Sequence, residues 1–521
     1  MSQTQLLSIA AAFHQTVEKF PDSTLVWSSD KPASFQAVDQ ASDRVAGALH
    51  RQGVRQGDRV ALYCINDLSF VQAYLGIQKI GAVVVPVNLL IGVDEISYIL
   101  QDAEIHALIY HQAMNEKVAG FRGELGELNA VCCIGEQAQQ ADDLMFSDWL
   151  TVDADVPVLN VDPQKDVAAI LYTSGTTGHP KGAMLTHHNL VSNTSSVLRG
   201  LHLQPGEDRL LVVLPMFHSF AATVGVLTPA LHGLTIVPVP KFDPALVSQT
   251  IAASQATVFL GVPSMYNLIL RMSEAQAVLW KSIRYGVAGG AAMPVELLRK
   301  FEARFNFPIL EGDGPTECSP VTCVNPLGGV RKPGSVGLPV PDVQMAIFNQ
   351  HGHVLPDDEI GEICVLGPNV MKGYWNLPDA TAETFFGEWL RTGDLGYRDA
   401  DGYIFMVDRI KDMIIVNGMN VYPRMLEETL YQHPKILEAA VVGEPHDSHG
   451  EIVVAHVVAK EGEQLDSAQI KAFCKEHLGQ HQRPRKVIIR ESLPKNATGK
   501  ILKRELRKEG ELERGVDNRI D

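Results

Sequence analysis

A run of glycine, serine and threonine around one lysine, ILYTSGTTGHPKGAMLTHHNL (170–190), has the composition of a phosphate-binding loop. Flexible backbone N–H groups, hydroxyl groups and a compact ammonium group can together surround phosphate oxygens. The run differs from the Walker loop of nucleoside triphosphatases, because Pro180 precedes the lysine and Gly182 follows it. It contains no GxGxxG dinucleotide-binding pattern either. From these residues alone, a phosphate cradle and a polar turn between strand and helix are equally supported.

The elements that must position this run alternate along the first half of the chain. Helical spacing is found in residues 34–53, 69–81 and 93–100, and strand-like runs in residues 59–64, 82–87 and 107–111. Strands that alternate with helices of this length predict parallel βαβ units. After about residue 335, short strands separated by Gly, Pro and Asp predict a mostly antiparallel subdomain.

A further unit is predicted to start near residues 408–411. It combines helical runs at 422–432 and 467–478 with strand-like runs at 438–444 and 452–460. The predicted fold class is therefore α/β. A large N-terminal domain, residues 1–410, has two βαβ-type subdomains and a β-rich subdomain at about 335–410, and residues 411–521 form a small α+β C-terminal domain.

Charge and cysteine content exclude several classes of protein. The 521 residues carry a formal net charge of −17, which disfavours nucleic-acid binding and electrostatic docking on anionic membranes. Seven cysteines without a CxxC pair predict neither a disulfide framework nor a zinc site, and they fit a reducing cytoplasm. The N-terminal residues lack the basic region of a signal peptide. We expect a cytoplasmic protein, with peripheral membrane association and homo-oligomerisation left open.

One uncharged segment, residues 210–240, has to be distinguished from a membrane-spanning helix. It contains no Asp, Glu, Lys or Arg, but four prolines and two histidines interrupt it. A spanning helix needs about 20 uninterrupted apolar residues. We therefore expect buried strand and helix in this segment.

Eight motifs in order resemble those of the acyl-adenylate-forming (AMP-binding) superfamily, which includes acyl-CoA synthetases, peptide-synthetase adenylation domains and firefly-type luciferases. They are YTSGTTGHPKG (172–182), LPMFHSF (214–220), GVPSMY (261–266), YGVAGGAAMP (285–294), EGDGPTECSP (311–320), GYWNLPDATAETF (373–385), LRTGDLGYRDADGYIFMVDRIKDMIIVNGMNVYP (390–423) and LPKNATGK (493–500). The resemblance covers nearly the whole chain and is closest to bacterial medium- and long-chain fatty acid–CoA ligases. It implies the cofactors ATP, Mg²⁺ and coenzyme A. A carboxylic acid would become acyl-AMP with release of pyrophosphate, and a thiol would then take the acyl group.

The resemblance also implies an ATP site. Thr316 would contact the α-phosphate, and the Glu317 carboxylate would bind Mg²⁺, which prefers hard oxygen ligands. Asp394 would accept hydrogen bonds from the ribose hydroxyls, and Arg409 would support ribose and phosphate. The remaining residues implied in ATP binding are Thr173, Ser174, Gly175, Thr176, Thr177, Gly178, Lys181, Gly290, Ala291, Glu311, Gly312, Asp313 and Gly314.

The C-terminal domain would be a mobile lid in this family. Lys500 would reach the carboxylate oxygen and the α-phosphate during adenylation, although by itself it is one more lysine on a basic tail. Lys411 matches the hinge position. Asn417 and Gly418 would then line the coenzyme A tunnel, where glycine lets the backbone pass close to the pantetheine arm.

The acyl pocket is expected along three of the motifs, with His218 lining or gating it as a catalytic-site residue. The pocket residues implied are Phe217, His218, Ala222, Val262, Gly289 and Gly290. Small side chains leave room for a long or bulky apolar acid, and each buried methylene contributes about 0.8 kcal/mol. Aryl acids stay open, and a hydrogen-bonded core histidine is the alternative for His218.

Two positions depart from the family pattern. Asp313 stands where an aromatic ring usually stacks on adenine, and such stacking is worth about 1–3 kcal/mol per base. Asp313 would instead accept a hydrogen bond from the adenine amino group. Gln482 stands where lysine is common, with Arg483 and Arg485 as candidate replacements in the contact to coenzyme A.

Two other functions stay open on the sequence. An adenylating enzyme of this type could load a separate carrier protein, since no Gly-Gly-x-Ser carrier module follows in the chain. A luciferase-like monooxygenase would use the same adenylate. A non-catalytic binding protein is disfavoured, because the implied phosphate, metal, ribose and lysine positions are all filled.

Overall fold

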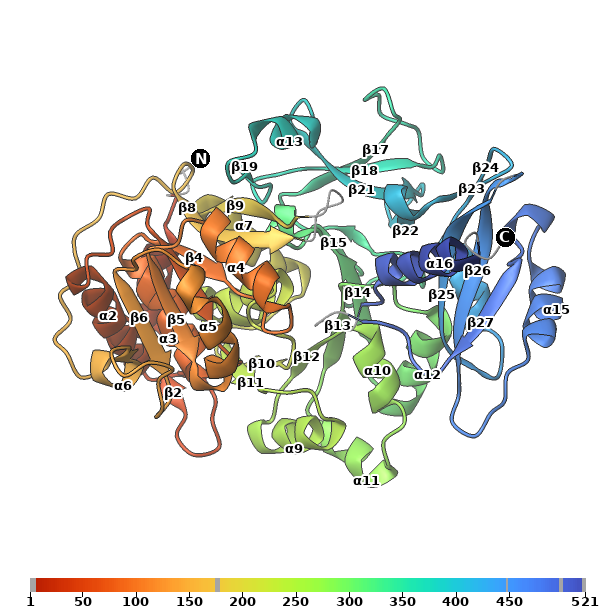
Figure 1. Cartoon of the computed structure of the whole chain (residues 1–521). Helices are drawn as coiled ribbons and strands as arrows, with labels where there is room; N and C mark the ends of the chain where they lie inside the picture. The colour runs from red at the N-terminus through yellow and green to blue at the C-terminus, as the bar shows by residue number, and fades with distance from the viewer. Residues whose placement is uncertain (1–5, 174–178, 447, 496–499, 518–521) are drawn as a thin grey trace.

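The computed structural model describes residues 6–173, 179–446, 448–495 and 500–517, the last seven of these by their backbone alone. Figure 1 shows two large sheets side by side, a smaller sheet around β17–β22 and a C-terminal unit around β25–β27. Together they form a mixed α/β fold with a large N-terminal domain and a smaller C-terminal domain, as the sequence predicts.

The first large sheet has eight strands in the order β19-β9-β8-β4-β3-β5-β6-β7. Their bounds are β3 (Arg59–Tyr63), β4 (Val83–Pro86), β5 (Ala107–His111), β6 (Ala130–Ile134), β7 (Leu144–Met145), β8 (Val167–Thr173), β9 (Lys181–Thr186) and β19 (Gly373–Tyr374). Strands β3 to β8 pair in parallel, which confirms the predicted βαβ units, whereas β9 runs antiparallel to both β8 and β19.

Helices of this half begin at residues that favour helix starts. The side chains of Ser34 and Asp67 accept hydrogen bonds from backbone N–H groups three residues later, and so satisfy donors that a helix leaves free. The helices are α1 (Ile9–Lys19), α2 (Phe35–Arg51), α3 (Leu68–Lys79), α4 (Val93–Asp102), α5 (Asn115–Phe121) and α6 (Phe146–Trp149).

The second large sheet has nine strands in the order β16-β15-β14-β13-β12-β10-β11-β1-β2. The strands are β1 (Thr24–Val26), β2 (Ala33–Ser34), β10 (Arg209–Val212), β11 (Thr235–Pro238), β12 (Val258–Gly261), β13 (Tyr285–Ala288), β14 (Ile309–Asp313), β15 (Cys323–Val324) and β16 (Leu338–Pro339). The helices are α7 (His187–Gly200), α8 (Thr228–His232), α9 (Pro244–Ser254), α10 (Pro263–Ile269), α11 (Glu274–Ala277) and α12 (Val295–Phe305). One hydrophobic core extends across both large sheets.

The uncharged segment 210–240 lies in this second sheet. It forms β10, a π-helical stretch over Ala221–Leu227, α8 and β11, and most of it is buried. This arrangement confirms the expected buried strand and helix. Across the described part of the chain, no helix is both long enough and apolar enough to cross a membrane.

The smaller N-terminal sheet follows residue 335, and all its pairings are antiparallel as predicted. Its elements are β17 (Gln344–Phe348), β18 (Gly361–Leu366), α13 (Pro378–Glu383), β20 (Phe385–Phe386), β21 (Trp389–Arg398) and β22 (Ile404–Arg409).

The C-terminal unit has its own sheet and two small cores. Its elements are β23 (Ile414–Val416), β24 (Met419–Val421), α14 (Pro423–Tyr431), β25 (Ile436–His446), β26 (Gly450–Ala459), α15 (Ser467–His477), β27 (Lys486–Arg490) and α16 (Lys503–Asp517). The predicted helices and strands of this unit are present, and β27 adds a parallel pairing to β26. The boundary between residues 410 and 411 stays a prediction.

Asn66 joins the two large sheets just after β3. Its buried Nδ2 donates to the carbonyl oxygens of Val212 (3.2 Å), Leu214 (2.9 Å) and Val239 (3.2 Å). Its Oδ1 accepts from the Met216 N–H at 2.8 Å. One amide side chain therefore fixes the chain that leads from β10 into the LPMFHSF motif.

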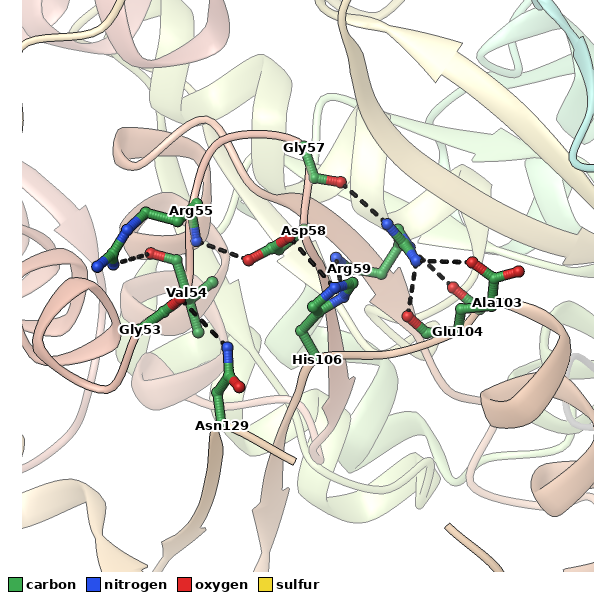
Figure 2. A network of polar contacts seen from close by, with 10 residues as sticks. All are labelled: Gly53, Val54, Arg55, Gly57, Asp58, Arg59, Ala103, Glu104, His106 and Asn129. Carbon is green, nitrogen blue, oxygen red and sulfur yellow. Dashed lines mark hydrogen bonds and ion pairs between the residues drawn. The ribbon is translucent and has the colours of Figure 1, made fainter. Parts of the chain in front are cut away.

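Replacing Asn66 should therefore destabilise the fold. We expect Asn66→Ala to lower the free energy of unfolding by about 3 kcal/mol, because buried carbonyl and amide groups lose their partner. The control Asn129→Ala removes one exposed bond to the Gly53 carbonyl (Figure 2) and should change it by less than about 0.5 kcal/mol. Urea denaturation measures both, and equal effects would contradict this role of Asn66.

Candidate active site

The implied site residues gather at the carboxyl ends of parallel strands, where open α/β sheets bind ligands. Thr173 ends β8, and Asp313 ends β14, with Thr316 and Glu317 following directly. Gly289 and its neighbours follow β13. Residues 174–178 lie outside the described residues, so the structure does not place Ser174, Gly175, Thr176, Thr177 and Gly178.

Glu317 lies among hydroxyl groups. Its Oε1 is 3.5 Å from the Thr173 hydroxyl and accepts a hydrogen bond from Tyr374 Oη at 2.8 Å. The ammonium nitrogen of Lys181 lies 5.1 Å from the centre of the Tyr374 ring. Glu317, Thr173 and Lys181 are thus brought together, although the sequence separates them by up to 144 residues.

This group of residues fits a magnesium ion. No cluster of three or more His, Cys, Asp or Glu able to hold a metal occurs among the described residues. Magnesium, however, commonly takes one or two protein carboxylates and completes its shell with substrate phosphates and water. The single carboxylate of Glu317, beside Thr173 and Lys181, is the donor set expected of such a shared site.

Thr316 faces the second large sheet. Its hydroxyl lies 3.1 Å from the hydroxyl of Ser219, a buried residue of the LPMFHSF motif. The contact joins the implied α-phosphate residue to the implied acyl segment. Ser219 and Tyr374 are two site residues that sequence reasoning missed, although both stand inside motifs that the resemblance uses.

The ribose and phosphate residues implied by the resemblance form an ion pair. Asp394 in β21 and Arg409 in β22 are opposite in strand register, with Arg409 Nε 3.1 Å from Asp394 Oδ1. Asp394 is almost fully buried, and its own N–H bonds to Thr392 Oγ1 at 3.1 Å. The neighbouring cation keeps a carboxylate acceptor in a defined orientation.

Lys500 joins this group from the C-terminal domain. Burial and the Arg409 guanidinium lower the pKa of Lys500 to about 8, while Asp394 and Asp313 act in the opposite direction. The same ammonium group contributes to the lowered pKa of His218. The Lys500 charge is therefore close enough to act on both the ion pair and His218 of the implied acyl segment.

Asp313 is the residue at the unusual position. Burial and the nearby Asp394 carboxylate raise the pKa of Asp313, whereas Arg409 and Lys500 oppose that rise. Its backbone pairs with Cys323 of β15. Asp313 thus adds a second carboxylate to the charged group of Asp394, Arg409 and Lys500.

Glu311 acts on the loop after β13. It is buried, its Oε1 accepts from the Met293 N–H at 3.0 Å, and burial raises its pKa to about 7. The loop it holds contains Gly290 and Ala291, and Gly290 has a φ of 76°, which favours glycine. The structure therefore gives Glu311 a loop-holding contact, and ATP contact by this side chain stays a prediction.

The two glycines of EGDGPTE have no room for a side chain. A Cβ on Gly314 would lie 1.6 Å from the Pro320 carbonyl oxygen, and one on Gly312 would lie 2.8 Å from that of Cys323. Close backbone approach between β14 and the following chain thus requires both glycines, whatever they do for ATP.

The implied acyl segment carries a neutral histidine. Burial, followed by the Lys500 charge, lowers the pKa of His218 to about 4. Its Nδ1 accepts from the Phe220 N–H at 3.3 Å, which leaves the proton on Nε2. Phe220 also packs against Gly289, where an added Cβ would lie 3.3 Å from its ring.

The other implied pocket residues lie in two places. Some are close to His218 in the sequence, and the others pack against the loop after β13. Phe217 and Ala222 are buried, and so is Val262, whose side chain would lie 3.7 Å from a Cβ on Gly290. The structure thus brings Val262 to Gly290 and Phe220 to Gly289. Their contact with an acyl chain stays a prediction.

Residues from the C-terminal domain contact the N-terminal domain beyond Lys500. On α14, Glu428 accepts a hydrogen bond from the Val295 N–H at the start of α12, and the Arg424 guanidinium counteracts the raised pKa of Glu311. Lys411, the implied hinge, is held among charges, and burial lowers its pKa. In this arrangement of the domains, α14 therefore contacts the N-terminal domain as Lys500 does.

The implied coenzyme A residues lie on the turn between β23 and β24. Asn417 and Gly418 both have positive φ, 52° and 78°. Asn417 lines a cavity of about 520 Å³ whose wall also includes His481, Arg483 and Arg485. Two arginines beside a cavity suit a phosphate-bearing ligand.

The whole-chain comparison identifies the class. The profile of the family described as AMP-binding enzyme matches residues 13–375, and that of its C-terminal domain matches residues 425–500. The chain belongs to the AMP-binding enzyme family, which confirms the resemblance drawn from its motifs. It is an AMP-forming acid–thiol ligase that uses ATP and coenzyme A.

Individual relatives span different acids. A long-chain-fatty-acid–CoA ligase of Bacillus subtilis (strain 168) is 34% identical over 94% of this chain and 92% of its own. A sulfoacetate–CoA ligase of Cupriavidus necator (strain H16) is 36% identical over 95% and 96%. ATP-bound MatB from Rhodopseudomonas palustris superposes with a TM-score of 0.88 at 31% identity, covering 96% of this chain and 99% of that one.

The pKa of Lys500 sets a pH dependence for adenylation. A lysine that must be cationic loses its effect as the pH rises through about 8. We expect kcat/KM for ATP to fall about tenfold per pH unit above that point, since this parameter reports the free enzyme. ATP–pyrophosphate exchange measures it.

The control for this profile is Lys500→Arg, whose guanidinium stays charged over the same range. The variant should be slower at pH 7 but show no decline between pH 8 and 10. A decline of equal size in both enzymes would assign the titration to another group.

Proposed function

We propose that this ligase activates a medium- to long-chain fatty acid as acyl-AMP and then transfers the acyl group to coenzyme A. The observation that carries the proposal is the position of Lys500 beside Asp313, Asp394 and Arg409 at the carboxyl end of β14. Adenylation needs a cation held where negative charge develops, and the C-terminal domain supplies it here.

In the first half-reaction, a carboxylate oxygen of the acid attacks the α-phosphorus of ATP, and the bond to the bridging oxygen of pyrophosphate breaks. The Thr316 hydroxyl and the Lys500 ammonium donate to the α-phosphate oxygens. Residues 173–181 hold the β- and γ-phosphates that leave together. Asp394 accepts from the ribose hydroxyls, and Arg409 orients that carboxylate through their ion pair.

Magnesium has its place at Glu317 in this scheme. The ion would neutralise charge on the phosphate oxygens as pyrophosphate departs. Tyr374 donates to the same Glu317 oxygen that lies near Thr173, and so orients the carboxylate that would hold the metal.

In the second half-reaction, the coenzyme A thiolate attacks the acyl carbonyl carbon and AMP leaves. We propose that the C-terminal domain turns about Lys411, withdraws Lys500 and presents Asn417 and Gly418 to the pantetheine arm. The cavity beside Asn417, with its arginine residues, supports a role in holding the phosphates of coenzyme A.

The choice of an apolar acid rests on the implied pocket. Phe217, Ala222 and Val262 are apolar and buried, and His218 is neutral at physiological pH. Such surroundings favour alkyl over charged substituents, because an unpaired charge is costly to bury. An aryl acid satisfies the same chemistry, so alkyl and aryl acids are compared in the test below.

A pyrophosphate-release screen with ATP, Mg²⁺ and coenzyme A tests the proposal across alkyl, aryl and sulfonated acids. We expect the highest kcat/KM for medium- or long-chain fatty acids. Lys500→Ala should slow pyrophosphate release about a hundredfold, roughly 3 kcal/mol, but leave thioester formation from supplied acyl-AMP intact. Equal loss in both half-reactions would contradict the role of Lys500. If the enzyme transfers the acyl group to a carrier-protein thiol rather than to coenzyme A, or oxidises the acyl-AMP with oxygen, the proposed second half-reaction is wrong.

The carboxylate at position 313 leads to a separate prediction about nucleotide binding. If Asp313 contacts ATP specifically, Asp313→Tyr should weaken ATP binding about tenfold, about 1.4 kcal/mol, despite the ring it introduces. Isothermal titration calorimetry with a non-hydrolysable ATP analogue measures this affinity. Tighter binding by the variant would instead show that the wild-type site only lacks a stacking partner.

A further inference from the structure

Helix α4 contacts two residues, Tyr172 and His179, within the segment 170–190. The Tyr98 ring stacks on the His179 ring, with centroids 4.6 Å apart and planes at 27°. One turn later, Asp102 Oδ2 accepts a hydrogen bond from Tyr172 Oη at 2.5 Å. Tyr172 directly precedes Thr173, and His179 lies two residues before Lys181. A single helix therefore contacts the residue before Thr173 and a residue close to Lys181.

The C-terminal end of α4 is itself fixed to the sheet. Arg59 in β3 donates from Nε to the Ala103 carbonyl at 2.9 Å and from Nη2 to the Glu104 carbonyl at 2.8 Å (Figure 2). A cation at this end of a helix satisfies carbonyl groups left without helical partners and is favoured by the helix dipole. Arg59 also pairs with the Glu104 carboxylate at 3.1 Å.

Trp375 connects the C-terminal end of α4 to the segment that contacts Glu317, the proposed magnesium ligand. Its Nε1 donates to the Asp102 carbonyl at 3.0 Å, and its ring lies 5.1 Å from the Arg59 guanidinium carbon. The preceding residue, Tyr374, contacts Glu317 and Lys181. Two consecutive residues at the end of β19 therefore contact Glu317 and α4, respectively.

We propose that Tyr98 and Asp102 are positioning residues for ATP, which act through His179 and Tyr172 on the nearby Lys181 and Thr173. Groups that donate to a departing phosphate are effective only when they are already in place. The inference rests on the proposed phosphate role of Thr173 and Lys181. Its effect is confined to the first half-reaction, because pyrophosphate has left before coenzyme A reacts.

The experiment compares Tyr98→Leu, which removes the ring, with Tyr98→Phe, which keeps the ring and removes only the hydroxyl that bonds to Asp102. Acid-dependent ATP–pyrophosphate exchange should show the KM for ATP raised about fivefold in Tyr98→Leu and little changed in Tyr98→Phe, the size expected of one aromatic pair. The KM for the acid and thioester formation from supplied acyl-AMP should stay at wild-type values.

His179→Ala removes the other ring from an exposed position, so folding does not limit it. It should raise the KM for ATP as Tyr98→Leu does. The double variant should have the same KM for ATP as either single variant, because both substitutions remove the same ring contact. Unchanged KM values for ATP, or equal losses in both half-reactions, overturn the inference. Wild-type enzyme without any acid-dependent exchange would instead overturn the proposed function and this inference with it.

Discussion

Lys500 of the C-terminal domain is buried beside the charged groups of the N-terminal domain, which already include a cation, Arg409. Burial and Arg409 lower its pKa from an ordinary value of 10.5 to about 8, which corresponds to about 3 kcal/mol against the charged form. Asp394 and Asp313 offset part of this cost. A bound triphosphate would add negative charge at the same place and favour the cationic lysine further. Nucleotide binding and this domain arrangement are thus expected to favour each other.

The same balance gives a reason for the unusual residue at position 313. An aromatic side chain there would remove one of the negative charges that face Arg409 and Lys500. Burial and the Asp394 carboxylate raise the pKa of Asp313, and the same two cations oppose that rise. The departure from the family pattern therefore concerns the charges around Lys500 as much as it concerns adenine.

Several polar side chains hold the segments that carry the candidate site residues. Asn66 fixes the chain entering LPMFHSF, Glu311 holds the loop after β13, and Tyr374 orients Glu317. Each is a polar side chain that is buried or half-buried and bonded to a specific partner in another element. Such contacts hold reacting groups in a defined geometry without touching the substrate.

The alternating strands and helices could be predicted from the sequence because their periodicity depends on local residues. The order of the motifs identified the family because the residues of each motif are adjacent in the sequence. Thr173, Glu317, Asp394 and Lys500 could be named for the same reason. Their mutual geometry could not, since β8, β14, β21 and the C-terminal domain meet only in the folded chain. The bond from the Met293 backbone to the Glu311 carboxylate could not be read from the sequence either, and ATP contact by Glu311 stays a prediction.

By itself, the sequence determined the fold class, the reaction class and the residue types available to carry it, because these depend on local patterns. Only the tertiary structure decided which of those residues carry shifted pKa values, since burial and neighbouring charges depend on the whole fold. It also decided that Tyr98 meets His179 and that Asp102 meets Tyr172. Those pairs are about 70 to 80 residues apart, and no local spacing connects them.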